Sequence, residues 1–181
     1  INVPVTLRAA DAARKPTVEL ERTALFEIKD GGSLKLENLH LSGKSAPDSA
    51  GNALVRTSRY SMLQAYQLLV DGCEVSDLDV NHSFNFLAVS KSTLADRIDI
   101  RDSVFRNVSG SVLELNLETD DLGMYNAEYV AIVDSTFTGI GEAGNTGTDV
   151  HADAADVVAA DLDLAGVQAD ADVDADRSKR L

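Results

Sequence analysis

The sequence predicts an all-β fold, a right-handed parallel β-helix (a solenoid) of roughly five to six coils. The first observation is a six-residue repeat. It begins with an aliphatic residue, has Asn, Asp or Gly at its third position, and ends with a bulky apolar residue. It occurs at 36–41, 70–75, 100–105, 132–137 and, more weakly, 159–164. The central residues Asn38, Gly72, Asp102, Asp134 and Asp161 are spaced 34, 30, 32 and 27 residues apart.

The second observation is strand-like alternation inside each repeat. Leu34 and Leu36 alternate with Lys35 and Glu37, and 97–101 and 112–117 alternate similarly. Such alternation predicts half-buried strands, two or three in each unit. Residues 63–70 have some helical spacing, but their neighbours favour a strand.

The third observation is composition, since aromatic residues make up 5% of the chain and Trp is absent. Stacked aliphatic ladders fill a narrow solenoid interior without large aromatic rings. We expect Asn or Asp at each repeat centre to turn a corner in the left-handed conformation, which Gly72 also adopts easily. Cys73 is the single cysteine, and its place in a repeat predicts a small buried side chain.

The order of these segments predicts one β-helix domain over 1–168 and an acidic low-complexity tail over 169–181. Two excursions, 43–60 and 116–127, are expected to leave the coils as loops beside a groove. Because the chain begins at Ile1, we expect a processed product or a fragment. The first residues offer no amphipathic cap, so we expect the first coil to stack on preceding sequence.

The charge balance narrows the partners. The chain has 30 acidic and 16 basic residues and a formal charge of −14. Phosphate neutralisation needs a surplus of Lys and Arg, so we expect neither nucleic acid nor an anionic membrane as partner. A polyanionic substrate would need a local basic patch.

Several longer motifs occur in order along the chain, at 39–43, 46–52, 55–62, 78–86 and 119–130. Through these motifs, roughly residues 20–140 resemble the second half of two-domain alginate lyases. Those enzymes belong to the chondroitinase-B-like polysaccharide lyases.

This resemblance implies a secreted or periplasmic β-helical enzyme that depolymerises alginate by β-elimination. In the family, a Lys removes the C5 proton, an Arg helps protonate the leaving oxygen, and Ca²⁺ commonly neutralises the uronate carboxylate. The Asn-Lys-Ser and Arg-His-Gly motifs that carry this chemistry do not occur here. We therefore expect a non-catalytic C-terminal β-helix, with a preceding catalytic β-helix domain as partner and Ca²⁺ held mainly outside this chain.

The candidate site residues follow from side-chain chemistry. Arg56, Arg59 and Tyr60 could bind uronates by forked and stacking contacts, and His82 could contact a saccharide. Each could instead be structural. Lys91 with Arg97 or Arg101 could mimic the lyase base and acid, although outward charges on strands are usually just solvated. Asp120 and Asp121 could help to hold Ca²⁺, or form a solvated turn.

Two alternatives remain open at this point. The chain could be a lyase in its own right that uses Lys91 and an Arg. It could also be a polysaccharide-binding or structural β-helix without lyase activity.

Overall fold

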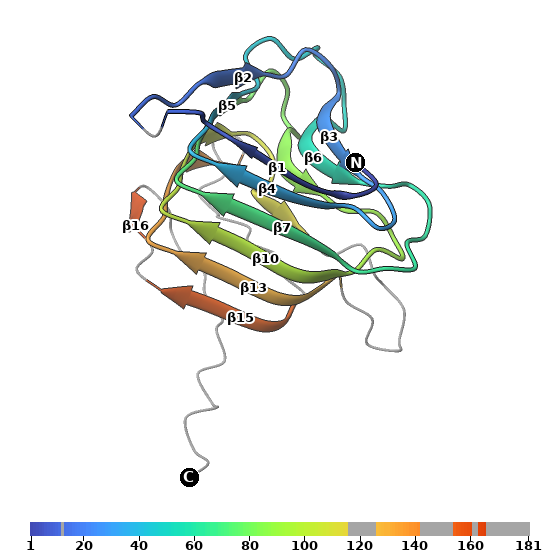
Figure 1. Ribbon diagram of the computed structural model, residues 1–181. Helices are drawn as coiled ribbons and strands as arrows, with labels where there is room; N and C mark the ends of the chain where they lie inside the picture. The colour runs from blue at the N-terminus through green and yellow to red at the C-terminus, as the bar shows by residue number, and fades with distance from the viewer. Residues whose placement is uncertain (12, 116–125, 142–153, 161–162, 166–181) are drawn as a thin grey trace.

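A computed structural model describes residues 1–11, 13–115, 126–141, 154–160 and 163–165. Parallel strands stack into a right-handed β-helix, which confirms the predicted fold class (Figure 1). The strands form three sheets, here called A, B and C, which the chain enters in that order. Among the described residues, four coils contribute a strand to all three sheets, and two further coils contribute to sheets A and B. None of these residues forms a helix that could cross a membrane.

The strands of sheet A stack in coil order and form the front face in Figure 1. They are β1 (Pro4–Arg8), β4 (Ser33–Glu37), β7 (Tyr66–Asp71), β10 (Ala95–Arg101), β13 (Ala127–Val133) and β15 (Ala154–Ala160). Sheet B contains β2 (Thr17–Glu19), β5 (His40–Ser42), β8 (Glu74–Leu78), β11 (Val104–Val108), β14 (Thr136–Ile140) and β16 (Asp163–Ala165). Sheet C contains β3 (Ala24–Ile28), β6 (Ala53–Thr57), β9 (Asn85–Ala88) and β12 (Leu113–Glu114).

The predicted repeats are the A-to-B corners of successive coils. Strand register aligns the repeats, so that the first aliphatic positions form one row, Leu36, Val70, Ile100, Ile132 and Ala159. The corner residues Asn38, Gly72, Asp102 and Asp134 all have positive φ, between 48° and 58°. The predicted left-handed corners are therefore confirmed at four coils, and the fifth, Asp161, lies outside the described residues.

A buried ladder supports these corners from inside. Cys73 is buried, as predicted, and burial raises the pKa of its thiol. Its backbone N–H donates to Ser103 Oγ at 3.1 Å, and the Ser103 N–H donates to Ser135 Oγ at 3.2 Å. Each serine hydroxyl in turn donates to a carbonyl two residues earlier. At the corners, the backbone N–H groups of Cys73 and Ser103 therefore bond to serine hydroxyl groups of the next coil and not to another strand.

The core consists of aliphatic rows with a short aromatic stack. Leu34 and Leu36 are buried while Lys35 and Glu37 are partly exposed, as the alternation predicted. Phe105 packs edge-on against Phe86, with ring centroids 5.0 Å apart, and stacks on Phe137 at 5.1 Å. These three phenylalanine rings thus lie inside the solenoid between sheets B and C.

Two local predictions have clear outcomes. Residues 66–71 form strand β7, as the neighbours of 63–70 indicated. The prediction of one loop over 43–60 was wrong, because 53–57 form β6, where Leu54 and Val55 join the core. The polar residues that precede this strand hid its aliphatic run. Most of the second excursion and the tail over 169–181 lie outside the described residues.

Candidate functional site

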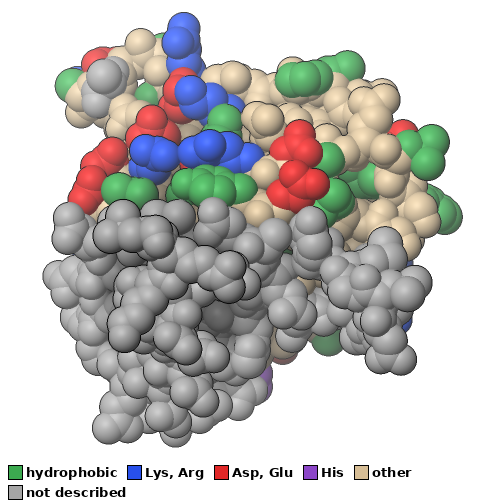
Figure 2. Space-filling model, turned by 90° about the horizontal axis from the view of Figure 1, so that it is seen from below, with side chains coloured by type: hydrophobic (Ala, Val, Ile, Leu, Met, Phe, Trp, Pro, Cys, Tyr) green, Lys and Arg blue, Asp and Glu red, His purple; other side chains and the backbone are tan. Residues whose placement is uncertain are grey.

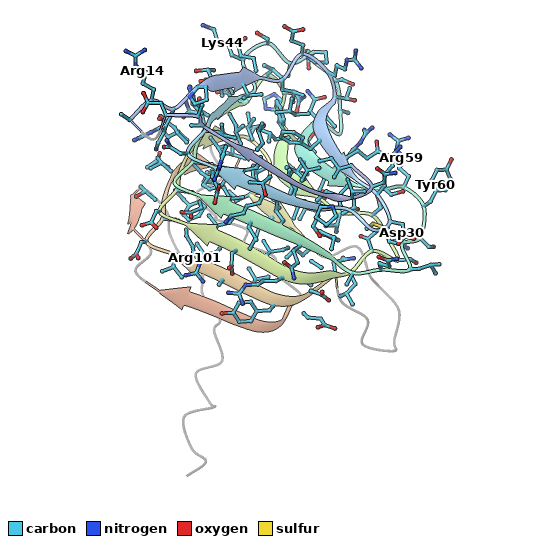
Figure 3. All side chains as sticks on the ribbon, viewed as in Figure 1. Arg14, Asp30, Lys44, Arg59, Tyr60 and Arg101 are labelled. Carbon is cyan, nitrogen blue, oxygen red and sulfur yellow. The ribbon has the colours of Figure 1, made fainter. Side chains whose placement is uncertain are left out.

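Three turns connect sheet C to sheet A on successive coils and lie beside one another. They are 29–32, 58–65 and 89–94, and we call their stack the C–A corner. Figure 3 shows Asp30, Arg59 and Tyr60 together at this edge of the molecule. Three of the predicted site residues, Arg59, Tyr60 and Lys91, belong to these turns.

The middle turn is held from both sides by hydrogen bonds. Asp30 Oδ1 on the preceding coil accepts the backbone N–H groups of Leu63 at 2.8 Å and Gln64 at 2.9 Å. On the following coil, the carbonyl of Ser92 accepts the N–H of Met62 at 3.0 Å. The loop backbone is thereby fixed, although the side chains at 59–61 and 63–64 are exposed.

Buried hydroxyl groups organise the turn that carries Lys91. Thr57 Oγ1 accepts the N–H of Ser90 at 2.8 Å and lies 3.2 Å from Thr93 Oγ1. The Thr93 hydroxyl is within hydrogen-bonding distance of the Ser90 carbonyl at 2.6 Å. These contacts tie the end of β6 to the turn after β9, so Arg59 and Lys91 follow equivalent strand ends on adjacent coils.

The fixed backbone presents an exposed ring and exposed cations. Tyr60 is 83% exposed, and its N–H donates to Ser58 Oγ at 3.1 Å. Arg59 and Lys91 are exposed, and neither has an ion-pair partner within the described part of the chain. Lys29, on the preceding coil, is 58% exposed and lies 4.0 Å from a Glu27 oxygen. An acidic protein thus places cations on three successive turns.

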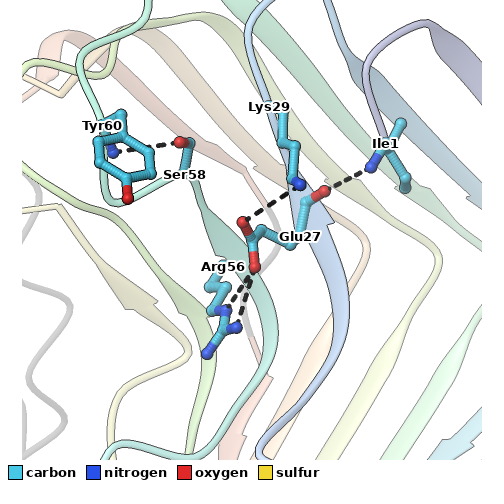
Figure 4. A network of polar contacts seen from close by, with 6 residues as sticks. All are labelled: Ile1, Glu27, Lys29, Arg56, Ser58 and Tyr60. Carbon is cyan, nitrogen blue, oxygen red and sulfur yellow. Dashed lines mark hydrogen bonds and ion pairs between the residues drawn. The ribbon is translucent and has the colours of Figure 1, made fainter.

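Arg56 acts at the same corner through a carboxylate. Its Nε and Nη2 donate to Glu27 Oε2 at 3.2 and 2.9 Å, a contact between β6 and β3 (Figure 4). This hydrogen bond is the main cause of the lowered pKa of Glu27. Through this edge of its guanidinium, Arg56 ties two coils together and offsets the negative charge of Glu27 beside the C–A corner.

The other predicted residues lie elsewhere. His82 is exposed on the turn between sheets B and C, where Asn81 Nδ2 donates to the Ser49 carbonyl at 2.8 Å. Arg97 and Arg101 lie on β10, and Figure 3 shows Arg101 away from the edge that carries Arg59. The structure therefore groups Lys91 with Arg59 and Tyr60 at the C–A corner. Lys91 lies on the turn that precedes β10, the strand that carries Arg97 and Arg101.

A metal centre is not found in the part of the chain that the structure describes. Those residues contain no cluster of three or more His, Cys, Asp or Glu side chains that could hold an ion. Asp120 and Asp121 lie outside the described residues. The side chains of the described residues consequently do not provide a site that fits Ca²⁺, which takes six to eight oxygen ligands.

Sequence reasoning missed Asp30 and Lys29 as parts of the site. Lys29-Asp30-Gly31-Gly32 has the composition of a turn, and Asp commonly accepts backbone N–H groups in turns. Its partners, however, are 33 and 34 residues away in sequence. A register between coils was needed before this contact could be found.

Comparison with known proteins now identifies the chain at the level of family. A family described as Domain of unknown function (DUF4957) matches residues 2–120. The chain belongs to this family. A search of curated proteins found no match.

Solved structures add a more specific likeness. The chain is similar to the PL6 family alginate lyase AlyGC, with 31% identity over 90% of this chain and a TM-score of 0.78. A mutant of the same enzyme matches with 32% identity over 88% of this chain and a TM-score of 0.76. The chain spans 23% and 22% of these two structures. It is thus a β-helix related to polysaccharide lyases.

Proposed function

We propose that this DUF4957 chain is a non-catalytic β-helix of an alginate lyase that holds polyuronate at the C–A corner. The observation that supports it most is the 31% identity to an alginate lyase over 90% of this chain. The Asn-Lys-Ser and Arg-His-Gly motifs that would supply base and acid do not occur in the sequence. The proposal assigns the elimination to a preceding β-helix domain.

The corner suits an anionic polysaccharide for electrostatic reasons. Four cationic side chains, Lys29, Arg56, Arg59 and Lys91, lie in or just before its turns, against the carboxylates of Glu27 and Asp30. Both carboxylates already accept hydrogen bonds within the protein. Successive coils are about 4.8 Å apart, so a polymer that carries one carboxylate per sugar could meet a cation on more than one coil.

Tyr60 complements the charges. An exposed aromatic ring offers an apolar face to the C–H groups of a sugar, and the Ser58 hydroxyl fixes the backbone that carries it. Charged and stacking contacts together would orient a uronate chain. The proposal includes a secreted or periplasmic location and membership in the chondroitinase-B-like lyases, as well as Ca²⁺ bound mainly outside this chain.

Activity and binding measurements on the full chain test this proposal. Incubation with polymannuronate and Ca²⁺ should give no rise in the ultraviolet absorbance of the unsaturated product, whereas titration should show binding. Robust Ca²⁺-dependent turnover would refute the non-catalytic role. Equal affinity for polymannuronate, chondroitin and a neutral glucan would instead favour a structural β-helix.

A further inference from the structure

An arginine pair on the outer face of sheet A forms a second cluster with features of a site. Arg97 and Arg101 flank Asp99 on β10, so all three side chains leave the same face of the strand. Asp99 Oδ2 accepts from Arg97 Nε at 2.8 Å and lies 3.5 Å from Arg101 Nη2. One carboxylate oxygen thus positions both guanidinium groups.

The neighbouring strand fixes Arg97 further. Its guanidinium carbon lies 4.6 Å from the ring centroid of Tyr129 on β13. Stacking on an aromatic face restrains the planar group without using its N–H donors. The Asp99 hydrogen bond also raises the pKa of Arg97, so the group stays charged.

Asp99 is unusual because of its burial. Its side chain is 10% exposed, and Oδ1 is buried with no hydrogen-bond partner among the residues that the structure describes. Leaving a buried carboxylate oxygen unbonded is costly. The contacts of Asp99 with both arginines are made through Oδ2, so this buried carboxylate holds the two guanidinium groups in place.

The arginines themselves remain available. Their side chains are 40% and 44% exposed. Within the described residues, Arg97 Nη1 and Nη2 and Arg101 Nε and Nη1 have no bonding partner. Both guanidinium groups are already held in place and keep unbonded N–H donors. Less conformational entropy is therefore lost when they bind a planar anion.

The surroundings favour a singly charged anion. The adjacent strand β7 contributes Asp71, beside Arg101, and β4, one strand further away, carries a Lys35–Glu37 pair with a 2.6 Å contact. Seen from below, the described surface has Lys and Arg side chains between Asp and Glu side chains (Figure 2). Arg97, Arg101 and Asp99 together carry one net positive charge, which Asp71 beside Arg101 offsets. So little net charge suits a singly charged carboxylate, held by the guanidinium N–H donors, better than a phosphate dianion.

From this geometry we infer that Arg97 and Arg101 form a second uronate-binding subsite on the outer face of sheet A, with Asp99 as its positioning residue. This inference rests on the proposed binding of polyuronate. The turn 89–94 leads directly into β10, so a polymer held at Lys91 that continues onto sheet A meets Arg97 before Arg101. The two sites together form one path.

Binding of an oligomannuronate to the full chain, measured by calorimetry, tests the inference. Arg97→Lys and Arg101→Lys keep the positive charge but remove the paired N–H donors of the guanidinium group. Each should weaken binding by about tenfold, which corresponds to the loss of one charged hydrogen bond. Lys35→Ala on the same face should leave affinity unchanged. Unchanged affinity in both arginine variants, while Arg59→Ala still weakens binding, would overturn this subsite and leave the proposed function standing.

Asp99→Asn separates orientation from simple attraction. The substitution removes a negative charge, so nonspecific attraction predicts tighter binding of the oligomannuronate. Loss of positioning predicts weaker binding at an unchanged melting temperature, and this is the result we expect. Tighter binding would overturn the role of Asp99. Absence of any oligomannuronate binding by the unaltered chain would refute the proposed function itself.

Discussion

Asn38, Gly72, Asp102 and Asp134 occupy the same corner of four successive coils, and each has positive φ. At the residue scale, this shared backbone conformation explains why the repeat is visible in the sequence. Asn, Asp and Gly tolerate the left-handed region better than other residues do. The corners could be predicted from sequence because backbone geometry alone decides which residues fit there.

Substitution of Gly72 measures this backbone requirement. A Cβ at Gly72 would have nothing within 4 Å, so Gly72→Ala should cost about 1 kcal/mol from backbone strain alone. A Cβ at Gly43 would lie 2.6 Å from the Asp77 carbonyl and 2.8 Å from Phe84, so Gly43→Ala should cost more. Denaturant unfolding of both variants checks the order, and a larger cost at Gly72 would contradict it.

The Arg56–Glu27 pair predicts a pH dependence. The folded state lowers the pKa of Glu27, mainly through the Arg56 hydrogen bond. Its contribution is therefore fully present above the unfolded pKa of about 4.3 and is lost as pH falls through the folded pKa. Glu27→Gln should remove this part of the acid-induced loss of stability. An unchanged acid slope in thermal unfolding of Glu27→Gln would contradict the assignment.

At the element scale, the loop 58–65 shows where sequence reasoning stops. Tyr60 and Arg59 were predicted as binding residues from their chemistry, but their grouping with Lys91 depends on the stacking of turns with different lengths. Register between coils fixes that grouping, and it cannot be read from residue spacing. Asp30 was missed because its hydrogen-bond partners belong to the next coil.

Removing the Asp30 contact should loosen the loop. Asp30→Ala deletes the acceptor of two backbone N–H groups, which should lower local stability by about 1–3 kcal/mol. Asp30→Asn keeps an oxygen acceptor and serves as the matched control. Amide hydrogen exchange at Leu63 and Gln64 should accelerate in the Ala variant and much less in the Asn variant. Equal exchange in all three proteins would show that Asp30 does not hold the loop.

At the whole-molecule scale, the stack is less complete at its first coil. Leu7, Val18, Leu25 and Phe26 are only partly buried, whereas Leu36 and Leu41 one coil later are fully buried. Val3 and Val5 are 56% and 37% exposed. Strands β1, β2 and β3 each pair on one side among the described residues. Such an edge is suited to pairing with another coil.

The rate of amide hydrogen exchange should therefore be higher in the first coil than in the coils that follow it. In the 181-residue chain, amides of β1 should exchange faster than those of β4, β7 and β10, which have strands on both sides. Strong protection of β1 amides in a monomer would contradict the interpretation of the first coil as an open edge of the stack.

Amide chemical shifts recorded during titration of the full chain with an oligomannuronate test the central claim most directly. Polyuronate binding at the C–A corner predicts shifts concentrated in the turns 58–65 and 89–94 and extending along β10. The turn that carries His82, between sheets B and C, should remain unchanged. Shifts centred on His82, or none at saturating ligand, would contradict the account.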